Sequence, residues 1–96
     1  MNRGEIIARL ASERAALERL GVASLKLFGS AARNEAGPRS DADFIVRFKE
    51  PPTFDSYMDL KLYIEQVLGI RVDLVTESAI RPELRKAIER EAVRVT

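Results

Sequence analysis

Short apolar segments typical of strands alternate along this chain with segments typical of helices, and this alternation is the strongest constraint on its fold. Apolar residues dominate segments 25–28, 43–48 and 71–75, and helical segments precede, separate and follow them. The resulting order is α-β-α-β-α-β-α, with residues 92–95 as a short closing strand. We therefore predict one α/β (α+β) domain over residues 1–96, a small mixed sheet of three to four strands flanked by helices.

The first helical segment, residues 1–20, is amphipathic. One face carries four apolar side chains at helical spacing: Ile6, Leu10, Leu17 and Leu20. Glu13 lies near this face and weakens the pattern, and Gly21 follows where a glycine commonly ends a helix. The pattern predicts one helix over residues 1–20.

Two later helices are predicted from the signals at their ends. Thr53 is a suitable N-cap and Gly69 a suitable stop for a helix that runs to Leu68. Pro82 suits the first turn of a last helix. The side chains of that last helix that we expect to pack inward are Leu84, Ala87 and Ile88.

Composition excludes several kinds of chemistry. The chain has no cysteine and no histidine, which excludes disulfides, thiolate catalysis, the usual zinc sites and a Ser-His-Asp relay. Sixteen Lys and Arg against fifteen Asp and Glu give a net charge of +1, too balanced for non-specific nucleic-acid binding. Because apolar runs are no longer than segment 44–46, we expect no membrane span and a cytoplasmic protein. Any catalysis must then depend on carboxylates.

Three aspartates occupy positions where aspartate is unusual. Asp43 opens an apolar strand, Asp41 precedes it by two residues, and Asp73 lies inside another strand. A spacing of two places Asp41 and Asp43 on one face of an extended chain, and Asp73 joins them if its strand is the neighbour. Carboxylates that converge repel one another unless a cation or protons neutralise them. The cluster therefore predicts a Mg²⁺ site that works with substrate phosphates.

Gly29 and Ser30 supply the second half of the predicted site. They lie between strand 25–28 and the start of a helical turn. A glycine there lets backbone N–H groups approach a phosphate, the helix start adds a partial positive charge, and the serine hydroxyl is a further donor. With the carboxylates, this turn predicts phosphoryl or nucleotidyl transfer assisted by metal ions.

These segments carry a family resemblance. Gly29-Ser30-Ala31-Ala32-Arg33 and Ser40-Asp41-Ala42-Asp43-Phe44 resemble the signature of the minimal nucleotidyltransferases of the DNA polymerase β-like superfamily. Val72-Asp73-Leu74-Val75 is similar to the segment that carries that family's third metal carboxylate. The chain departs from the pattern at Asn34, where a glycine often follows the arginine, and at Ala42, which replaces a branched residue. Neither departure touches a metal ligand, so both concern the shape of the loop.

The resemblance implies transfer of AMP from ATP to a hydroxyl, expected to be a tyrosine, of a HEPN-domain toxin. The chain would then be the antitoxin of a type VII toxin–antitoxin pair, in a homo- or hetero-oligomer, without a membrane or direct nucleic-acid contacts. The residues expected to bind two Mg²⁺ ions and to act in catalysis are Asp41, Asp43 and Asp73. Those expected to contact the nucleotide are Gly29, Ser30, Arg33 and Ser40.

Alternatives stay open at this point. A non-catalytic antitoxin that neutralises its partner by binding would carry the same motif as scaffold. An aminoglycoside-type nucleotidyltransferase would need a second domain or a dimer to build its pocket. Among single residues, Asp73 could pair with Arg71 or Arg47, and Arg33 could form an exposed salt bridge instead of a phosphate contact.

Overall fold

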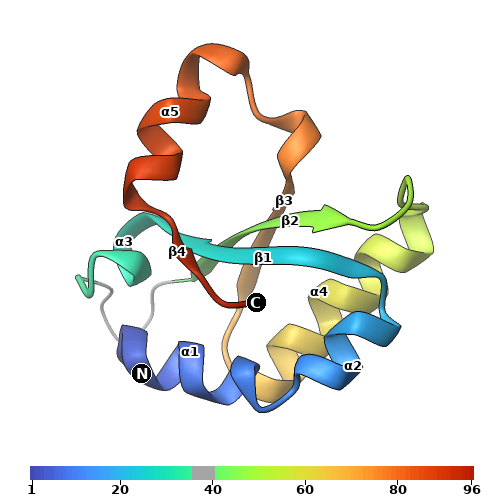
Figure 1. Cartoon of the computed structure of the whole chain (residues 1–96). Helices are drawn as coiled ribbons and strands as arrows, with labels where there is room; N and C mark the ends of the chain where they lie inside the picture. Colours follow the sequence, from blue (N-terminus) through green and yellow to red (C-terminus); the bar gives the residue numbers. More distant parts are fainter. Residues whose placement is uncertain (36–40) are drawn as a thin grey trace.

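The computed structural model describes residues 1–35 and 41–96, in which helices and strands alternate along the chain. In chain order the elements are α1 (Arg3–Ala11), α2 (Arg14–Arg19), β1 (Val22–Phe28), α3 (Gly29–Ala32), β2 (Ala42–Phe48), α4 (Phe54–Leu68), β3 (Val72–Thr76), the 3₁₀ helix η1 (Glu77–Ala79), α5 (Pro82–Glu91) and β4 (Val93–Arg94) (Figure 1). The strands form one sheet in the order β3-β2-β1-β4. Strand β1 is antiparallel to β2 and β4, and β2 is parallel to β3. The predicted mixed sheet with flanking helices is confirmed.

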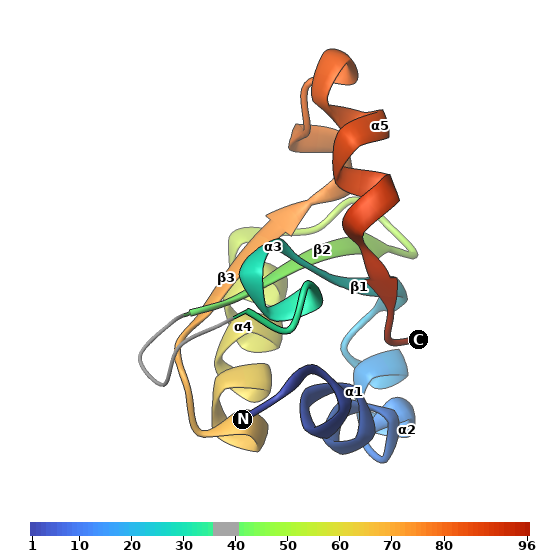
Figure 2. The ribbon, with the colours of Figure 1, turned by 90° about the vertical axis from the view of Figure 1, so that its left-hand side faces the viewer.

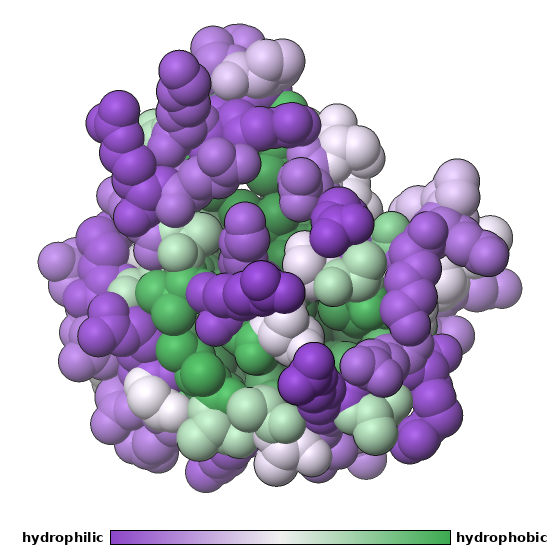
Figure 3. Space-filling model, in the orientation of Figure 1, coloured by the Kyte–Doolittle hydropathy of each residue, from purple (hydrophilic) through white to green (hydrophobic). Residues whose placement is uncertain are grey.

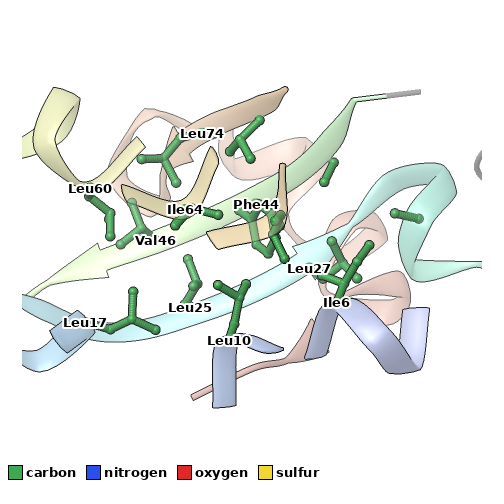
Figure 4. Packing of buried hydrophobic residues seen from close by; sticks show 14 of the residues in the cluster. Ile6, Leu10, Leu17, Leu25, Leu27, Phe44, Val46, Leu60, Ile64 and Leu74 are labelled. Carbon is green, nitrogen blue, oxygen red and sulfur yellow. The ribbon is translucent and has the colours of Figure 1, made fainter. Parts of the chain in front are cut away.

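The hydrophobic core lies between one face of the sheet and helices α1, α2 and α4 (Figures 1 and 2). Alternate residues of β2 point to this face, and Phe44 and Val46 are completely buried there. Side chains from the helices and from β1 complete the core (Figure 4): Ile6, Leu10, Leu17, Leu25, Leu27, Leu60 and Ile64. Each large apolar side chain buried in this way contributes about 1.5–3 kcal/mol. The other residues of β2, including Asp43, therefore point to the opposite face of the sheet.

Helix α4 begins and ends at the predicted residues. The Thr53 hydroxyl accepts a hydrogen bond from the Ser56 N–H at 3.0 Å, and the Ser56 hydroxyl accepts one from the Thr53 N–H at 2.8 Å. This reciprocal pair is a capping box. Gly69 ends the helix with a φ of 71°, in the left-handed region that favours glycine.

The prediction of one continuous helix over residues 1–20 is wrong, because the chain breaks it at residues 12–13. The Ser12 hydroxyl donates to the carbonyl of Arg9 at 2.7 Å, which satisfies an acceptor at the end of α1. The Glu13 carboxylate accepts a hydrogen bond from the Tyr63 hydroxyl at 2.6 Å. The break thus keeps a charged residue near the apolar face partly exposed and bonded to α4.

The prediction that Leu84, Ala87 and Ile88 pack inward is wrong for Leu84 and Ala87, which are exposed, whereas Ile88 is partly buried. No residue of α5 is buried, and Leu84 is 51% exposed. Helix α5 projects from the sheet on the side opposite α1 and α4 (Figures 1 and 2). It is followed at once by β4, whose Val93 and Arg94 pair with β1. Helical periodicity showed which side chains of α5 share a face, but no other element covers that face along its length in the described part of the chain.

The strand bounds differ slightly from the predicted ones: β1 begins at Val22 instead of Leu25, β3 is shifted by one residue, and β4 is shorter than predicted. A further observation concerns membranes: none of the helices in residues 1–35 and 41–96 is both long and apolar enough to cross one.

Candidate active site

Asp43 and Asp73 lie side by side on adjacent strands. The register of the parallel strands β2 and β3 pairs these two residues directly, so their side chains leave the same face of the sheet. Asp41 comes one residue before β2, and its spacing of two from Asp43 directs it to that face as well. The structure therefore pairs Asp43 with Asp73 where β2 and β3 begin, on the face opposite the hydrophobic core, and Asp41 lies near enough for its charge to affect Asp43.

The electrostatics of Asp43 reflect this convergence. Partial burial raises the pKa of the Asp43 carboxyl, and the negative charges of Asp73 and Asp41 raise it further. None of the ion pairs in residues 1–35 and 41–96 includes Asp73, which argues against its pairing with Arg71 or Arg47. A cation among these carboxylates would relieve their repulsion.

The donor set fits a magnesium ion in its chemistry. All three side chains offer carboxylate oxygens, which Mg²⁺ prefers as ligands together with substrate phosphates. They are not arranged as a ready-made metal cage, since the described residues contain no cluster of three acidic side chains close enough for one. Asp41 and Asp73 are exposed, so both side chains are free of packing that would prevent them from closing on an ion.

Gly29 places the predicted phosphate-binding turn directly against Asp43. Phe28, the last residue of β1, pairs with Asp43 in the sheet, and Gly29 follows with a φ of 72°. A Cβ atom on Gly29 would lie 2.5 Å from Oδ2 of Asp43 and 3.3 Å from its Cγ. Both the left-handed backbone and the close carboxylate therefore require glycine here. The turn and the acidic cluster form one site.

The other predicted nucleotide contacts differ in where the structure places them. Ser30 lies in the first turn of α3 and is partly exposed. Arg33 follows α3, and its guanidinium donates to Glu91 at 2.9 Å and to Glu35 at 3.1 Å. The hydrogen bond to Glu35 and the charge of Glu91 raise the pKa of Arg33. Ser40 lies outside the described residues. The roles of all three in nucleotide binding stay predictions.

At residue 34, in the loop after α3, the backbone has the conformation expected of a glycine, although the residue is an asparagine. Asn34 has a φ of 60°, which is the left-handed conformation that glycine adopts readily and asparagine tolerates. Its side-chain oxygen accepts a hydrogen bond from the Arg3 N–H at 3.1 Å, so it also ties the loop to α1. The departure from the family pattern at this position therefore leaves the turn intact.

Sequence reasoning missed Glu91 as the partner of Arg33. The two residues are 58 positions apart, and no local pattern connects them. Their pairing links α5 to the turn that carries Gly29 and Ser30, and only the fold reveals it.

Comparison with known proteins agrees with this geometry. Residues 9–95 match the family model described as a nucleotidyltransferase domain. Over 78 residues the chain is 42% identical to protein adenylyltransferase MntA of Thermococcus cleftensis, a match that covers 81% of this chain and 79% of that protein. A solved structure described as a minimal nucleotidyltransferase has a TM-score of 0.85 at 39% identity and covers 97% of this chain and 95% of its own.

Two solved toxin–antitoxin complexes share the fold at lower identity. One, with AMP-PNP, has a TM-score of 0.72 at 19% identity, over 100% of this chain and 73% of the other. The second, of a tri-AMPylated Shewanella oneidensis HEPN toxin with an MNT antitoxin, has a TM-score of 0.59 at 17% identity, over 85% of this chain and 67% of the other. At such identities the likeness concerns the fold alone. The family match over residues 9–95 and the close relatives show that this chain belongs to the nucleotidyltransferase family, as a minimal nucleotidyltransferase.

Proposed function

We propose that this nucleotidyltransferase transfers AMP from ATP to a tyrosine hydroxyl of a HEPN-domain toxin and so acts as the antitoxin of a type VII pair. The observation that carries the proposal is the register of Asp43 with Asp73, next to the turn at Gly29. The names of the relatives support the chemistry and the partner. The 42% identical relative is a protein adenylyltransferase, and a HEPN toxin in one of the complexes of similar fold is AMPylated.

The proposed reaction assigns separate roles in phosphate binding, metal binding and proton transfer to the residues of the site. The backbone N–H groups at the turn after Gly29 and the Ser30 hydroxyl bind the β- and γ-phosphates of ATP. Asp41, Asp43 and Asp73 hold two Mg²⁺ ions, which when bound neutralise phosphate charge and favour the ionised acceptor hydroxyl. Asp73, whose side chain is exposed, is the proposed base for that hydroxyl.

The reaction itself is an in-line displacement. The acceptor oxygen forms a bond to the α-phosphorus of ATP, the bond from that phosphorus to the bridging oxygen breaks, and pyrophosphate leaves. The phenolic proton passes to the Asp73 carboxylate. Asp43 and Asp73 leave the sheet on the face opposite the hydrophobic core, and α1, α2 and α4 cover the other face (Figures 1 and 2), so an acceptor carried by another protein can approach the carboxylates.

Intact mass of a co-expressed HEPN partner tests the proposal. Wild-type chain should add whole AMP units to the partner, and the double variant Asp41→Asn/Asp43→Asn should add none. Asp59→Asn is the matched control, because Asp59 is an exposed aspartate of α4, on the other side of the sheet, and its loss should change nothing.

The alternatives give different results in the same experiment. A partner that stays unmodified, yet is still inhibited by the double variant, would show an antitoxin that works by binding alone. Transfer to an aminoglycoside in the absence of any partner would instead show a small-molecule enzyme.

A further inference from the structure

A cavity of about 460 Å³ lies at the far end of β2 and β3 from the carboxylates. The end of β2, the loop that follows it, η1 and α5 enclose it, and Figure 3 shows the molecule hollowed between the lobe of η1 and α5 and the lobe of that loop. Three cationic residues line the cavity: Arg47, Lys49 and Arg85. Thr76 and Ser78, which carry hydroxyl groups, line it as well.

The cations around this cavity lack carboxylate partners. In the described part of the chain, the salt bridges involve other residues, so no carboxylate oxygen lies within 4.0 Å of these three side chains. Arg85 makes one long hydrogen bond, from Nη2 to the carbonyl of Glu77 at 3.4 Å. Its Nε is buried and has no acceptor among the described residues. Because Nε has no surface open to the cavity, a ligand there would bind the terminal N–H groups of the guanidinium, and an oxyanion is the group that a guanidinium binds best.

The lining favours a carboxylate over a phosphate. Glu50 and Glu77 also line the cavity, so the residues that line it carry a net charge of only +1. The attraction of an anion to this net charge grows in proportion to the anion's own charge, but the cost of removing the anion from water grows with the square of that charge, so a singly charged carboxylate fits the lining better than a doubly charged phosphate. The planar fork of Arg85 matches the paired oxygens of a carboxylate and of a phosphate alike, so the preference for a carboxylate rests on charge.

The position of the cavity on the same strand as Asp43 allows one protein surface to engage both the cavity and the carboxylate cluster. Arg47 and Asp43 lie four residues apart on β2 and point to the same face, which places them about 13 Å from each other. Ile45 lies between them and is only 4% exposed, so the two sites are separated by buried apolar surface. A ligand that engages both must be large enough to cover this separation.

We propose that the cavity is a receptor for an Asp or Glu side chain of the acceptor protein, which docks there while its hydroxyl is presented to the carboxylate cluster. That this protein is the acceptor rests on the proposed function. The carboxylate chemistry of the cavity rests on the charged residues that line it and not on the proposed function.

A titration followed by NMR tests the cavity with defined probes. The Nε–H signal of Arg85 is recorded while an acetylated, amidated Gly-Glu-Gly peptide, which carries one carboxylate, is added, and separately while inorganic phosphate is added at the same ionic strength. The peptide should shift the Arg85 signal, and it should bind at least about tenfold more tightly than phosphate does. Arg85→Ala should weaken peptide binding by about tenfold or more, the loss expected for one charge-assisted hydrogen bond.

Two further variants sharpen the result. Arg90→Ala removes an exposed arginine of the same helix that does not line the cavity, and it should leave peptide binding unchanged. Arg85→Lys keeps the charge and loses the fork, so it should bind with intermediate affinity. An unshifted Arg85 signal, equal binding by Arg85→Ala, or phosphate binding as tight as peptide binding would each overturn the proposal. Because the titration contains no nucleotide or acceptor protein, its failure is distinct from failure of AMP transfer.

Discussion

Replacing Gly29 by alanine should destabilise the fold by two separable effects. The first is the backbone: at a φ of 72° an L-residue costs roughly 1–2 kcal/mol. The second is the contact with Asp43, because the new Cβ would lie 2.5 Å from Oδ2 of its carboxylate. Moving that side chain by about 30° from its rotamer costs roughly 0.5–1.5 kcal/mol. Gly29→Ala should therefore lower the free energy of unfolding by about 1.5–3.5 kcal/mol.

Gly69 provides the matched control. Its φ is 71°, nearly the same as that of Gly29, but nothing lies within 4 Å of a Cβ built there. Gly69→Ala should therefore show the backbone cost alone, about 1–2 kcal/mol. Urea denaturation followed by circular dichroism at pH 7 in metal-free buffer measures both variants.

A double-mutant cycle isolates the contact. In an Asp43→Ala background the carboxylate is absent, so Gly29→Ala should cost no more than Gly69→Ala. Equal costs for the two glycines in the wild-type background would refute the reasoning, and so would an excess cost at Gly29 that survives the loss of Asp43.

Three other predictions follow from the electrostatics, the packing and the capping. Because the pKa of Asp43 is raised above its ordinary value of 3.8, the folded state holds this proton at pH values where the unfolded chain has lost it. The contribution of Asp43 to the free energy of unfolding should thus increase as the pH falls from neutral through the raised pKa. Wild type should therefore gain stability relative to Asp43→Asn over that pH range. At pH 7, in metal-free buffer, Asp43→Asn should be as stable as wild type or up to about 1 kcal/mol more stable. Leu84→Ala, on the exposed face of α5, should cost less than about 0.5 kcal/mol in urea denaturation, whereas Leu10→Ala in the core should cost about 2–5 kcal/mol; similar costs would show that α5 is packed. Thr53→Ala removes the capping box of α4 and should cost about 0.5–2 kcal/mol, and an unchanged urea midpoint would contradict that assignment.

Local signals in the sequence predicted the parts of the fold that depend on local interactions. Thr53 and Gly69 mark the two ends of α4 because capping and left-handed backbone act within one turn. The position of Asp43 and Asp73 inside apolar strands predicted a shared face if the two strands were neighbours, and the register of β2 with β3 pairs the two residues directly.

Long-range features could not be predicted in the same way. Whether the apolar face of α5 is covered depends on the direction in which the helix leaves the sheet (Figure 2). Helical periodicity in the sequence does not predict that direction. The ion pair of Arg33 with Glu91 and the hydrogen bond of Tyr63 with Glu13 each join residues at least 50 positions apart. These contacts depend on tertiary packing, so the break at residues 12–13 and the environment of Arg33 were accessible only from the structure.

Paramagnetic broadening by Mn²⁺, whose ligand preference resembles that of Mg²⁺, probes the metal-binding role of the carboxylates most directly. In the presence of a non-hydrolysable ATP analogue, small amounts of Mn²⁺ should broaden the amide signals around Gly29, Asp43 and Asp73 first, and Asp73→Asn should weaken that broadening. Broadening centred elsewhere, such as on the acidic residues of α5, or unchanged by the loss of Asp73, would contradict a shared ion site on this face of the sheet.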